Sequence, residues 1–395
     1  MRTRVQKVIV VAVSAFLALG LAACSGSGGS GATKSSGSKS PVKIGVLLSF
    51  GGSLGAGGLQ QMAGIQYYVD QVNATGGVGG HQIEIEKKDD NSDVATSIQQ
   101  FNLLANDPDV VAVIGPAGSG ETAGVKPVAE QLGVPLIGAV AAAALSNPPT
   151  HWWFRSYVPD ALQTQALLKV AATRGKTAVI VYPDDAFGQS GDQAFKQYAS
   201  AAGVTIKGEV SIPANATDPS IQVIKAIAMK PDFYIFWDGS NVARLAQEVE
   251  VARQNGVSNN TLLVLPQPAG QDAFVQAAGS AANGAIYFGQ MATNDPLPGA
   301  QTKFATGYKA ATGDVPDESV LQGYASISIL GEGLKQAAAK GAITRASVRN
   351  AIQGIKGFDS VLGSVTFDPT THNPVTLKEV GVNTFKDGKR VRYQG

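Results

Sequence analysis

The chain has 395 residues, 44% of them hydrophobic, a length that exceeds one ordinary hydrophobic core and indicates two domains or lobes. Its 31 basic and 30 acidic residues leave a net charge of +1 with no basic block beyond the N-terminus, which argues against nucleic acid as a partner. The single cysteine excludes an intrachain disulfide, and the three histidines lie far apart in the sequence, so we expect no metal, no cofactor and no catalytic residue.

The first residues carry the features of an export signal. Basic residues among the first seven precede the apolar stretch 8–21, which is shorter than a comfortable membrane span and has the length of a signal-peptide core. The stretch ends in Leu-Ala-Ala-Cys24, which resembles the bacterial lipobox. The resemblance implies a lipoprotein signal peptide over residues 1–23, cleaved before Cys24, whose thiol is lipidated. An uncleaved anchor with an incidental cysteine is the alternative.

The Gly/Ser-rich segment that follows is too poor in apolar residues to form a packed core. We expect residues 24–41 to be a tether with an r.m.s. reach of about 20–25 Å. Together with a lipidated Cys24, this tether predicts an extracytoplasmic body that is lipid-anchored to the cell membrane.

From residue 42 the chain alternates short β-rich apolar runs with amphipathic helical stretches, the pattern of a parallel α/β sheet. The first series predicts strands at 42–48, 82–88, 110–114 and 134–137, and helices at 59–73, after an N-cap at Asp93, and at 122–132. The second series, from residue 160, predicts strands at 177–182, 204–210, 232–237, 261–265 and 285–288, and helices at 191–202, 220–229 and 242–255. Three more helices, at 301–312, 319–339 and 347–355, and β-like stretches at 364–367 and 377–385 follow. Segments appended after both series indicate that the chain crosses between two lobes more than once.

The loops that follow the predicted strands are the places to look for a site, because ligands of open α/β sheets bind at the carboxyl ends of strands. One such loop, 115–122, is glycine-rich, but Glu121 stands where a phosphate-binding loop needs lysine. Its glycines still allow a tight turn into a helix whose free N–H groups, with the Ser119 hydroxyl, can hold an anion or a carbonyl. A plain strand-to-helix turn is the alternative.

No catalytic constellation is found in the sequence. Neither Ser119 nor Ser190 lies in the G-x-S-x-G frame of a nucleophile elbow. The acids Asp89, Asp90 and Asp93 lack the further oxygen ligands that calcium needs, and capping or turn formation explains them better. The pattern therefore predicts a protein that is not an enzyme.

Several motifs occur in a distinctive order from residue 42 to the C-terminus. They are DQVNATGG at 70–77, VIG at 113–115 followed by Ser119, GVPLI at 133–137, Phe154-Arg155, DAFG at 185–188, PDF at 231–233 and Gly323-Tyr324. In this order they resemble the leucine/isoleucine/valine-binding branch of the type I periplasmic solute-binding proteins.

The resemblance implies an α/β fold of two Rossmann-like lobes, joined by a three-strand hinge, that close on a ligand between them. We expect lobe 1 over residues 42–158 and 289–367, and lobe 2 over residues 159–288 and 368–395. The resemblance also implies delivery of a small solute to the permease subunits of an ABC transporter of the branched-chain amino-acid type, and we expect a monomer. A ligand-sensing subunit of a membrane signalling protein and, less favoured, a surface hydrolase are the alternatives.

Carried over residue by residue, the pocket of the family is only partly present. The serine that holds the ligand carboxylate matches Ser119, beside Gly120 in the glycine-rich loop. The threonine of the next loop falls near Ala142, which leaves only the backbone N–H groups of Ala141 and Ala142 as donors. The aromatic residue of the second lobe corresponds to Phe187.

The carboxylate that pairs with a ligand ammonium falls at the neutral Gln267, so Asp238, at a neighbouring strand end, is the candidate for the missing charge. Gly57 stands where relatives often carry an aromatic residue. With the alanine loop, it leaves room for a larger or flatter solute, on which Phe50 and Trp237 can stack beside the aromatic residue of lobe 2. Three ligand classes therefore stay open: an aromatic or other organic acid, an amide-type solute and an aliphatic amino acid.

Overall fold

The computed structural model describes residues 39–374 and 381–395. The predicted signal peptide, the lipidation site Cys24 and nearly all of the predicted tether lie outside the described residues. The first strand begins at Lys39, three residues before the expected position, because Lys39 already pairs with His81 of the neighbouring strand.

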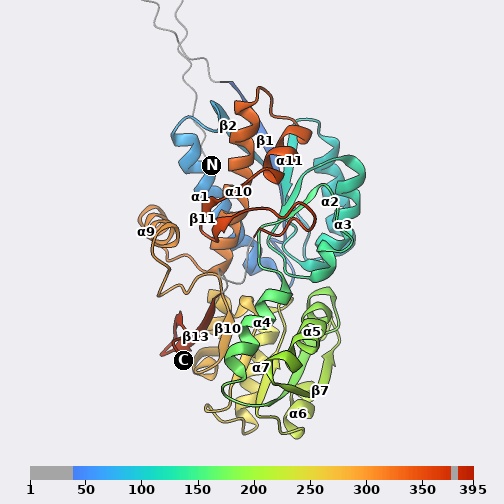
Figure 1. The fold of residues 1–395 in the computed structure, drawn as a ribbon, viewed down its shortest axis with the longest axis vertical. Coiled ribbons are helices and arrows are strands. Elements are labelled where there is room, and N and C mark those ends of the chain that lie inside the picture. The colour runs from blue at the N-terminus through green and yellow to red at the C-terminus, as the bar shows by residue number, and fades with distance from the viewer. Residues whose placement is uncertain (1–38, 375–380) are drawn as a thin grey trace, which may run out of the picture. The chain divides into compact units, whose positions relative to one another are not determined.

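Five parallel strands form the first sheet, in the order β2-β1-β3-β4-β5 (Figure 1). The central strand β3, VVAVI, is buried at all five residues, as expected when a parallel sheet is covered on both faces and its strands are rich in β-branched residues. Helices α1, α2 and α3 follow β1, β2 and β3 in the chain. The bounds are β1 Lys39–Leu48, α1 Gly55–Ala74, β2 His81–Asp89, α2 Val94–Asn106, β3 Val110–Ile114, α3 Ser119–Leu132, β4 Leu136–Gly138 and β5 Trp153–Arg155.

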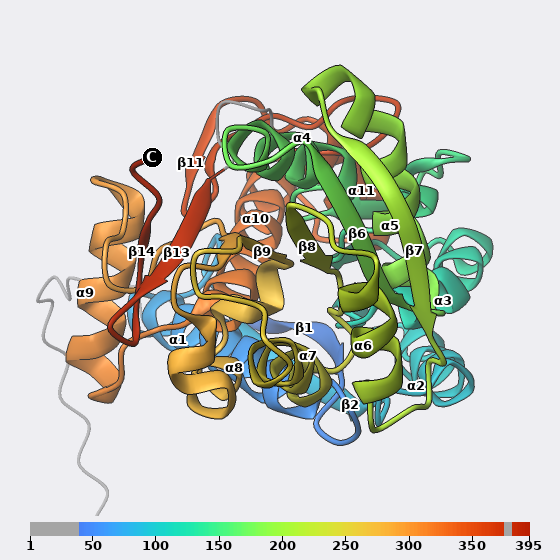
Figure 2. The ribbon, with the colours of Figure 1, turned by 90° about the horizontal axis from the view of Figure 1, so that it is seen from below.

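Seven strands form the second sheet, in the order β14-β13-β10-β9-β8-β6-β7, with β7 at one edge and β14 at the other (Figure 2). The strands β6 to β10 are parallel, whereas β13 and β14 form an antiparallel hairpin whose turn, Asp387-Gly388, has positive φ at both residues. The strand bounds are β6 Thr177–Pro183, β7 Thr205–Ile212, β8 Phe233–Phe236, β9 Leu263–Leu265, β10 Ile286–Phe288, β13 Val382–Lys386 and β14 Lys389–Arg392.

Helices cover both faces of the second sheet. Successive residues of β6 point to opposite faces, so Ile180 belongs to one hydrophobic cluster and Val179 and Val181 to another. The first cluster contains residues of α4 and α5, and the second contains residues of α6, α7 and α8, in agreement with Figure 2. The helix bounds are α4 Asp160–Ala171, α5 Ala186–Ala199, α6 Ser220–Ala228, α7 Val242–Gln254 and α8 Asp272–Ala278.

The segments after β10 return the chain to the side of the first sheet, within one compact unit of residues 38–395. Helix α10 packs on α1 through reciprocal glycines: a Cβ on Gly64 would lie 2.0 Å from the carbonyl oxygen of Val320, and one on Gly323 would lie 1.9 Å from that of Gln61. The chain then reaches β13 in the second sheet, so it passes between the sheets three times, as expected. The bounds are α9 Ala300–Thr312, α10 Glu318–Ala339, α11 Arg345–Gln353, β11 Phe358–Ser360 and β12 Gly363–Val365.

The largest differences from the sequence expectations are helix starts. Helix α5 begins at Ala186, five residues before its expected start, because the Asp185 side chain accepts a hydrogen bond from Gly188 N (2.9 Å) and caps it. Helices α1 and α3 also begin before their expected starts, because glycines in their first turns leave no hydrophobic period to recognise. The elements β5, α4, α8, β11 and β14 were not expected from the sequence, whereas the expected cap at Asp93 is confirmed by its bond from Thr96 N (2.7 Å).

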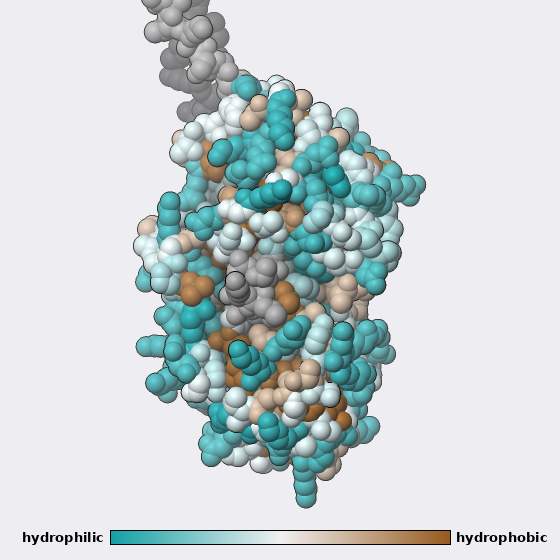
Figure 3. Space-filling view, viewed as in Figure 1, coloured by the Kyte–Doolittle hydropathy of each residue, from teal (hydrophilic) through white to brown (hydrophobic). Residues whose placement is uncertain are grey.

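Among the described residues, no helix combines the length and the apolar character that a membrane span requires. Hydrophilic residues cover most of the face of the molecule that Figure 3 shows, and apolar residues are scattered among them.

Candidate functional site

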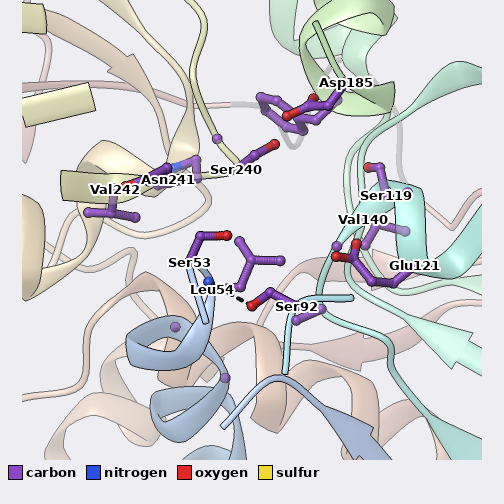
Figure 4. A pocket seen from close by; sticks show the side chains of 18 of the residues that line it. Ser53, Leu54, Ser92, Ser119, Glu121, Val140, Asp185, Ser240, Asn241 and Val242 are labelled. Atoms are coloured by element: carbon purple, nitrogen blue, oxygen red, sulfur yellow. Dashed lines mark hydrogen bonds between the residues drawn. The ribbon is translucent and has the colours of Figure 1, made fainter. Parts of the chain in front are cut away.

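A cavity of about 380 Å³ lies where the carboxyl ends of the strands of both sheets meet (Figure 4). This volume suits a small solute. Segments that follow β1, β2, β3 and β4 line one side, and segments that follow β6, β8 and β9 line the other. The lining residues include 53–54, 56–58, 92–94, 117–121, 139–141, 185–187, 239–242 and 267–268, together with Gln61, Tyr157, Ala214, Gln271 and Gln322.

Ser119 lies at the start of α3 and points its hydroxyl toward the cavity (Figure 4). Its side chain is 5% exposed, and Oγ has no hydrogen-bond partner among the described residues. A buried hydroxyl without a partner costs free energy, so this arrangement is suited to a ligand that supplies the missing hydrogen bond. Gly120, beside it, also lines the cavity.

The loop after β4 turns its carbonyl groups away from the cavity. The buried Arg155 donates to the carbonyl oxygens of Val140 and Ala142, and Asp160 N donates to that of Ala141 (3.1 Å). Burial lowers the pKa of Arg155 to about 10, so the guanidinium stays charged at neutral pH. No hydrogen bond joins the N–H of Ala141 or Ala142 to another described residue, which leaves two backbone donors beside the cavity. Of the two residues, Ala141 lines it and Ala142 does not.

Phe187, in the first turn of α5, lines the cavity from the side of the second sheet. Its ring stacks on the fully buried Trp237, with centroids 5.8 Å apart and an interplanar angle of 9°. Gly191 makes this possible, because a Cβ there would lie 1.8 Å from Nε1 of Trp237. Trp237 therefore packs against the face of Phe187 and does not itself line the cavity. The prediction that Trp237 stacks on the ligand is wrong for this reason, and Phe50, predicted to stack in the same way, also lies outside the lining.

Three carboxylates line the cavity, and its lining contains no Lys, Arg or His. Burial raises the pKa of Glu121, and Asp90, Asp185 and Asp93 raise it further through charge repulsion. Burial also raises the pKa of Asp185, whereas hydrogen bonds from Thr96 lower the pKa of Asp93. The cavity is therefore electronegative and suits a cationic group.

Asp238 does not reach the cavity, although it was the candidate for the counter-charge. Its carboxylate is fully buried, forms an ion pair with Arg244 and accepts from the N–H groups of Ser240 (3.2 Å) and Asn241 (3.1 Å). The side chain is thus used inside the protein. Gln267 does line the cavity, is 2% exposed, and has no partner for Nε2 among the described residues.

The room expected beside Gly57 is partly filled by a side chain from the other lobe. A Cβ on Gly57 would lie 3.2 Å from Nε2 of Gln271, which follows β9. Sequence reasoning used Glu121 only to exclude a phosphate loop and used Asp185 only as part of a motif. Both residues reach the same cavity only because the two lobes pack together, which the sequence does not show. The one signal in the sequence for a role in the site is that each residue follows the end of a predicted strand.

Two α/β sheets whose carboxyl ends border one small cavity define a two-lobe solute-binding protein. The chain belongs to the periplasmic binding protein family, which matches residues 41–378. Membership implies a small-molecule ligand and an extracytoplasmic location.

The relatives place the chain near the predicted branch. The Leu/Ile/Val-binding protein BraC3 of Rhizobium johnstonii is 25% identical over 361 residues, which cover 89% of this chain and 93% of that protein. The branched-chain amino acid substrate-binding protein LivJ of Streptococcus pneumoniae, in complex with isoleucine, has a TM-score of 0.79 at 24% identity over 89% of this chain and 97% of its own. A solute-binding protein of R. palustris, in complex with benzoate, has a TM-score of 0.76 at 22% identity over 89% and 95% of the two chains. The predicted α/β fold of type I periplasmic binding proteins is confirmed.

Proposed function

We propose that this protein is the solute-capturing subunit of an ABC importer of the branched-chain amino-acid type, and that it is held outside the cytoplasmic membrane by lipid on Cys24. The observation that carries the proposal is the cavity between the two sheets, which offers unpartnered donors and carboxylates on both walls. Such a site can hold a solute that has both a carboxylate or carbonyl group and an ammonium group.

The donors and the carboxylates of the cavity would bind different groups of the ligand. Ser119 Oγ and the N–H group of Ala141 would hold the carboxylate or carbonyl, and Glu121 with Asp185 would hold the ammonium. The bonds to a ligand carboxylate and to an ammonium involve a charged group, which makes them stronger than neutral hydrogen bonds. Phe187 would pack on the apolar part of the ligand.

Lobe closure would couple binding to transport, because only the closed arrangement brings both walls onto the ligand. The loop after β4 is already tied to the second lobe, since Ala143 N donates to Ser190 Oγ of α5 at 2.9 Å. The ligand would add further bonds across the same boundary and stabilise the closed pair of lobes, which the permease subunits would recognise.

The charge of the cavity favours one of the three expected ligand classes. The two complexes among the relatives contain isoleucine and benzoate. An acid without an ammonium group would bring a further negative charge next to Glu121 and Asp185, in a lining without a cationic side chain. An amino acid or a similar ammonium-bearing solute is therefore the favoured ligand.

Binding without chemistry is favoured over the hydrolase alternative. Ser119 has no histidine or other base as a partner, and the lining contains no histidine at all. Within residues 39–374 and 381–395, no cluster of His, Cys, Asp and Glu has the composition of a metal site. A sensing subunit would bind the same solute, and co-purification with either a permease or a signalling protein separates these two functions.

The test measures binding by the mature protein after unfolding and refolding have removed any ligand carried through purification. Thermal unfolding is recorded with amino acids, their amides, aromatic acids and short organic acids. A ligand present at 100 times its Kd adds about 2.7 kcal/mol to the free energy of unfolding, which is a clear shift in Tm.

The double variant Ser119→Ala/Phe187→Ala is expected to lose this shift, whereas Ser200→Ala, an exposed serine at the end of α5, is expected to keep it. Unchanged affinity in the double variant would refute the assigned site. The absence of a shift with every solute in the panel would refute the proposed function.

A further inference from the structure

Glu121 holds a carboxylate in the cavity that the fold does not need for its own hydrogen bonding. It is the third residue of α3, and its side chain turns back over Gly118, where a Cβ would lie 1.9 Å from Oε2. Glu121 is 9% exposed, and its carboxylate interacts with the backbone N–H of Glu121 itself but receives no hydrogen bond from another described residue. Figure 4 shows its oxygen atoms directed into the cavity on the same side as Ser119.

The other two acids of the lining have structural roles. Asp93 caps α2 through Thr96 N, and Asp185 caps α5 through Gly188 N. Of the three acids in the lining, Glu121 is therefore the one that does not cap a helix through the N–H of a later residue.

No cationic side chain of the lining balances this charge, and three buried or partly buried cations of the surrounding elements are paired elsewhere. Arg155 donates hydrogen bonds to carbonyl oxygens of the loop after β4, and Lys126 donates to those of Leu145 and Pro148. Arg244 forms an ion pair with Asp238. None of the three lines the cavity. When the lobes close and exclude water, the negative charge of the lining has to be balanced by the ligand itself.

A second, independent observation is that the same cavity also contains hydrogen-bond donors without partners. Ser119 Oγ and Gln267 Nε2 are donors without a partner among the described residues, and both side chains are more than nine-tenths buried. They come from the two different lobes and line the same space as Glu121. The ligand therefore needs an accepting end, a carboxylate or a carbonyl, and a cationic end.

We infer that Glu121 selects a solute with a net positive charge, such as a basic amino acid or the amide of an amino acid, over neutral and anionic solutes. The inference rests on the proposed function, because it names the class of ligand for the same cavity. In a neutral amino acid, the ammonium is offset by the ligand's own carboxylate, so the negative charge of the lining is not balanced. A ligand with a second cationic group, or one without the carboxylate, has a net positive charge that balances the lining.

A purely structural role for Glu121 makes a different prediction. A carboxylate in the first turn stabilises a helix, so a capping role requires that its neutralisation lowers stability. Here burial raises the pKa of Glu121, the backbone N–H of Glu121 lowers it and neighbouring acids raise it, with a net increase, so ionisation of this carboxylate opposes folding. Glu121→Gln should therefore leave the Tm of the ligand-free protein unchanged or higher.

The experiment uses the mature protein, stripped of ligand, and isothermal titration calorimetry with arginine, leucine amide, leucine and isovalerate. The wild type is expected to bind arginine or leucine amide at least about tenfold more tightly than leucine, and isovalerate least. Glu121→Gln is expected to weaken binding of the cationic solutes by about 10- to 100-fold, the loss for one charge-assisted hydrogen bond.

Two further variants separate the position of the carboxylate from the net charge of the protein. Gly118→Ala keeps the charge but displaces the carboxylate, since the backbone of Gly118 is extended and accepts alanine; it should weaken cation binding as well. Asp109→Asn removes an exposed carboxylate that precedes β3, at the opposite end of this strand from Glu121, and should bind as the wild type does.

Equal or tighter binding of leucine or isovalerate by the wild type would overturn the charge selection and leave the proposed function standing. Unchanged cation affinity in Glu121→Gln, with a lower Tm, would assign Glu121 to helix capping alone. If no solute binds, the proposed function fails and this inference fails with it.

Discussion

Glu318 makes the stability of this protein depend on pH in a predictable direction. It is the first residue of α10, fully buried, with Oε1 accepting from Met291 N (3.0 Å) and Oε2 without a partner among the described residues. Burial raises its pKa from 4.5 to about 8, and the neighbouring Asp317 raises it, while Met291 N–H and Arg390 act in the opposite direction. Glu318→Gln keeps the shape and the acceptor and removes the charge.

The sign follows from proton binding by the folded and unfolded states. Because the folded pKa is raised, the folded protein keeps a proton that the unfolded chain releases near pH 4.5, so stability falls as pH rises toward and through about 8. A shift of this size in one group removes about 3–4 kcal/mol of the free energy of unfolding between pH 5 and pH 8. Glu318→Gln should remove this contribution, so that its advantage over the wild type grows as pH rises.

The assay is urea unfolding of wild type and variant at pH 5, 6, 7 and 8, with the difference between the two proteins as the measured quantity. Glu332→Gln, on the same helix, is the control, because that carboxylate is partly exposed and accepts from Gln336. A constant difference between Glu318→Gln and the wild type over this range would refute the reasoning.

Three further predictions concern contacts of the cavity and of the helix interface. Ser190→Ala should lower the free energy of unfolding by about 1–2 kcal/mol in urea melts, because it leaves Ala143 N–H without its acceptor; no loss would show that the bond between the lobes is not formed in solution. Gly64→Ala should cost about 1–3 kcal/mol, since its Cβ would meet the carbonyl oxygen of Val320; a more stable variant would mean that helix propensity outweighs this contact. Phe187→Ala should weaken ligand binding about tenfold in calorimetry without a comparable loss of Tm, and an unchanged Kd would remove this ring from the site.

The alternation of strands and helices could be predicted because it depends on local pattern. A run such as VVAVI in β3 has no polar residue to place at a surface, so it is a buried strand in any compact arrangement. The cap at Asp93 is equally local, because its partner Thr96 is three residues away. Order and spacing of the motifs then indicated the family, which the match over residues 41–378 confirms.

The charges of the cavity could not be assigned in this way. Asp238 follows a strand end, as a ligand-binding acid would, but the fold turns it toward Arg244 and buries the pair. Glu121 also follows a strand end, in the first turn of α3, and the absence of a side chain at Gly118 lets its carboxylate turn back into the cavity. Both residues follow strands in the sequence, and only one of them faces the ligand space.

The sequence by itself therefore determined most of the elements, their parallel arrangement and the loops in which a site would form, because hydrophobic period and caps act over a few residues. Only the tertiary structure decided which side chains of those loops face the cavity and which are paired inside the lobes. The physical reason is that the orientation of a buried charge depends on the partners and the space around it, and these come from segments far apart in the chain.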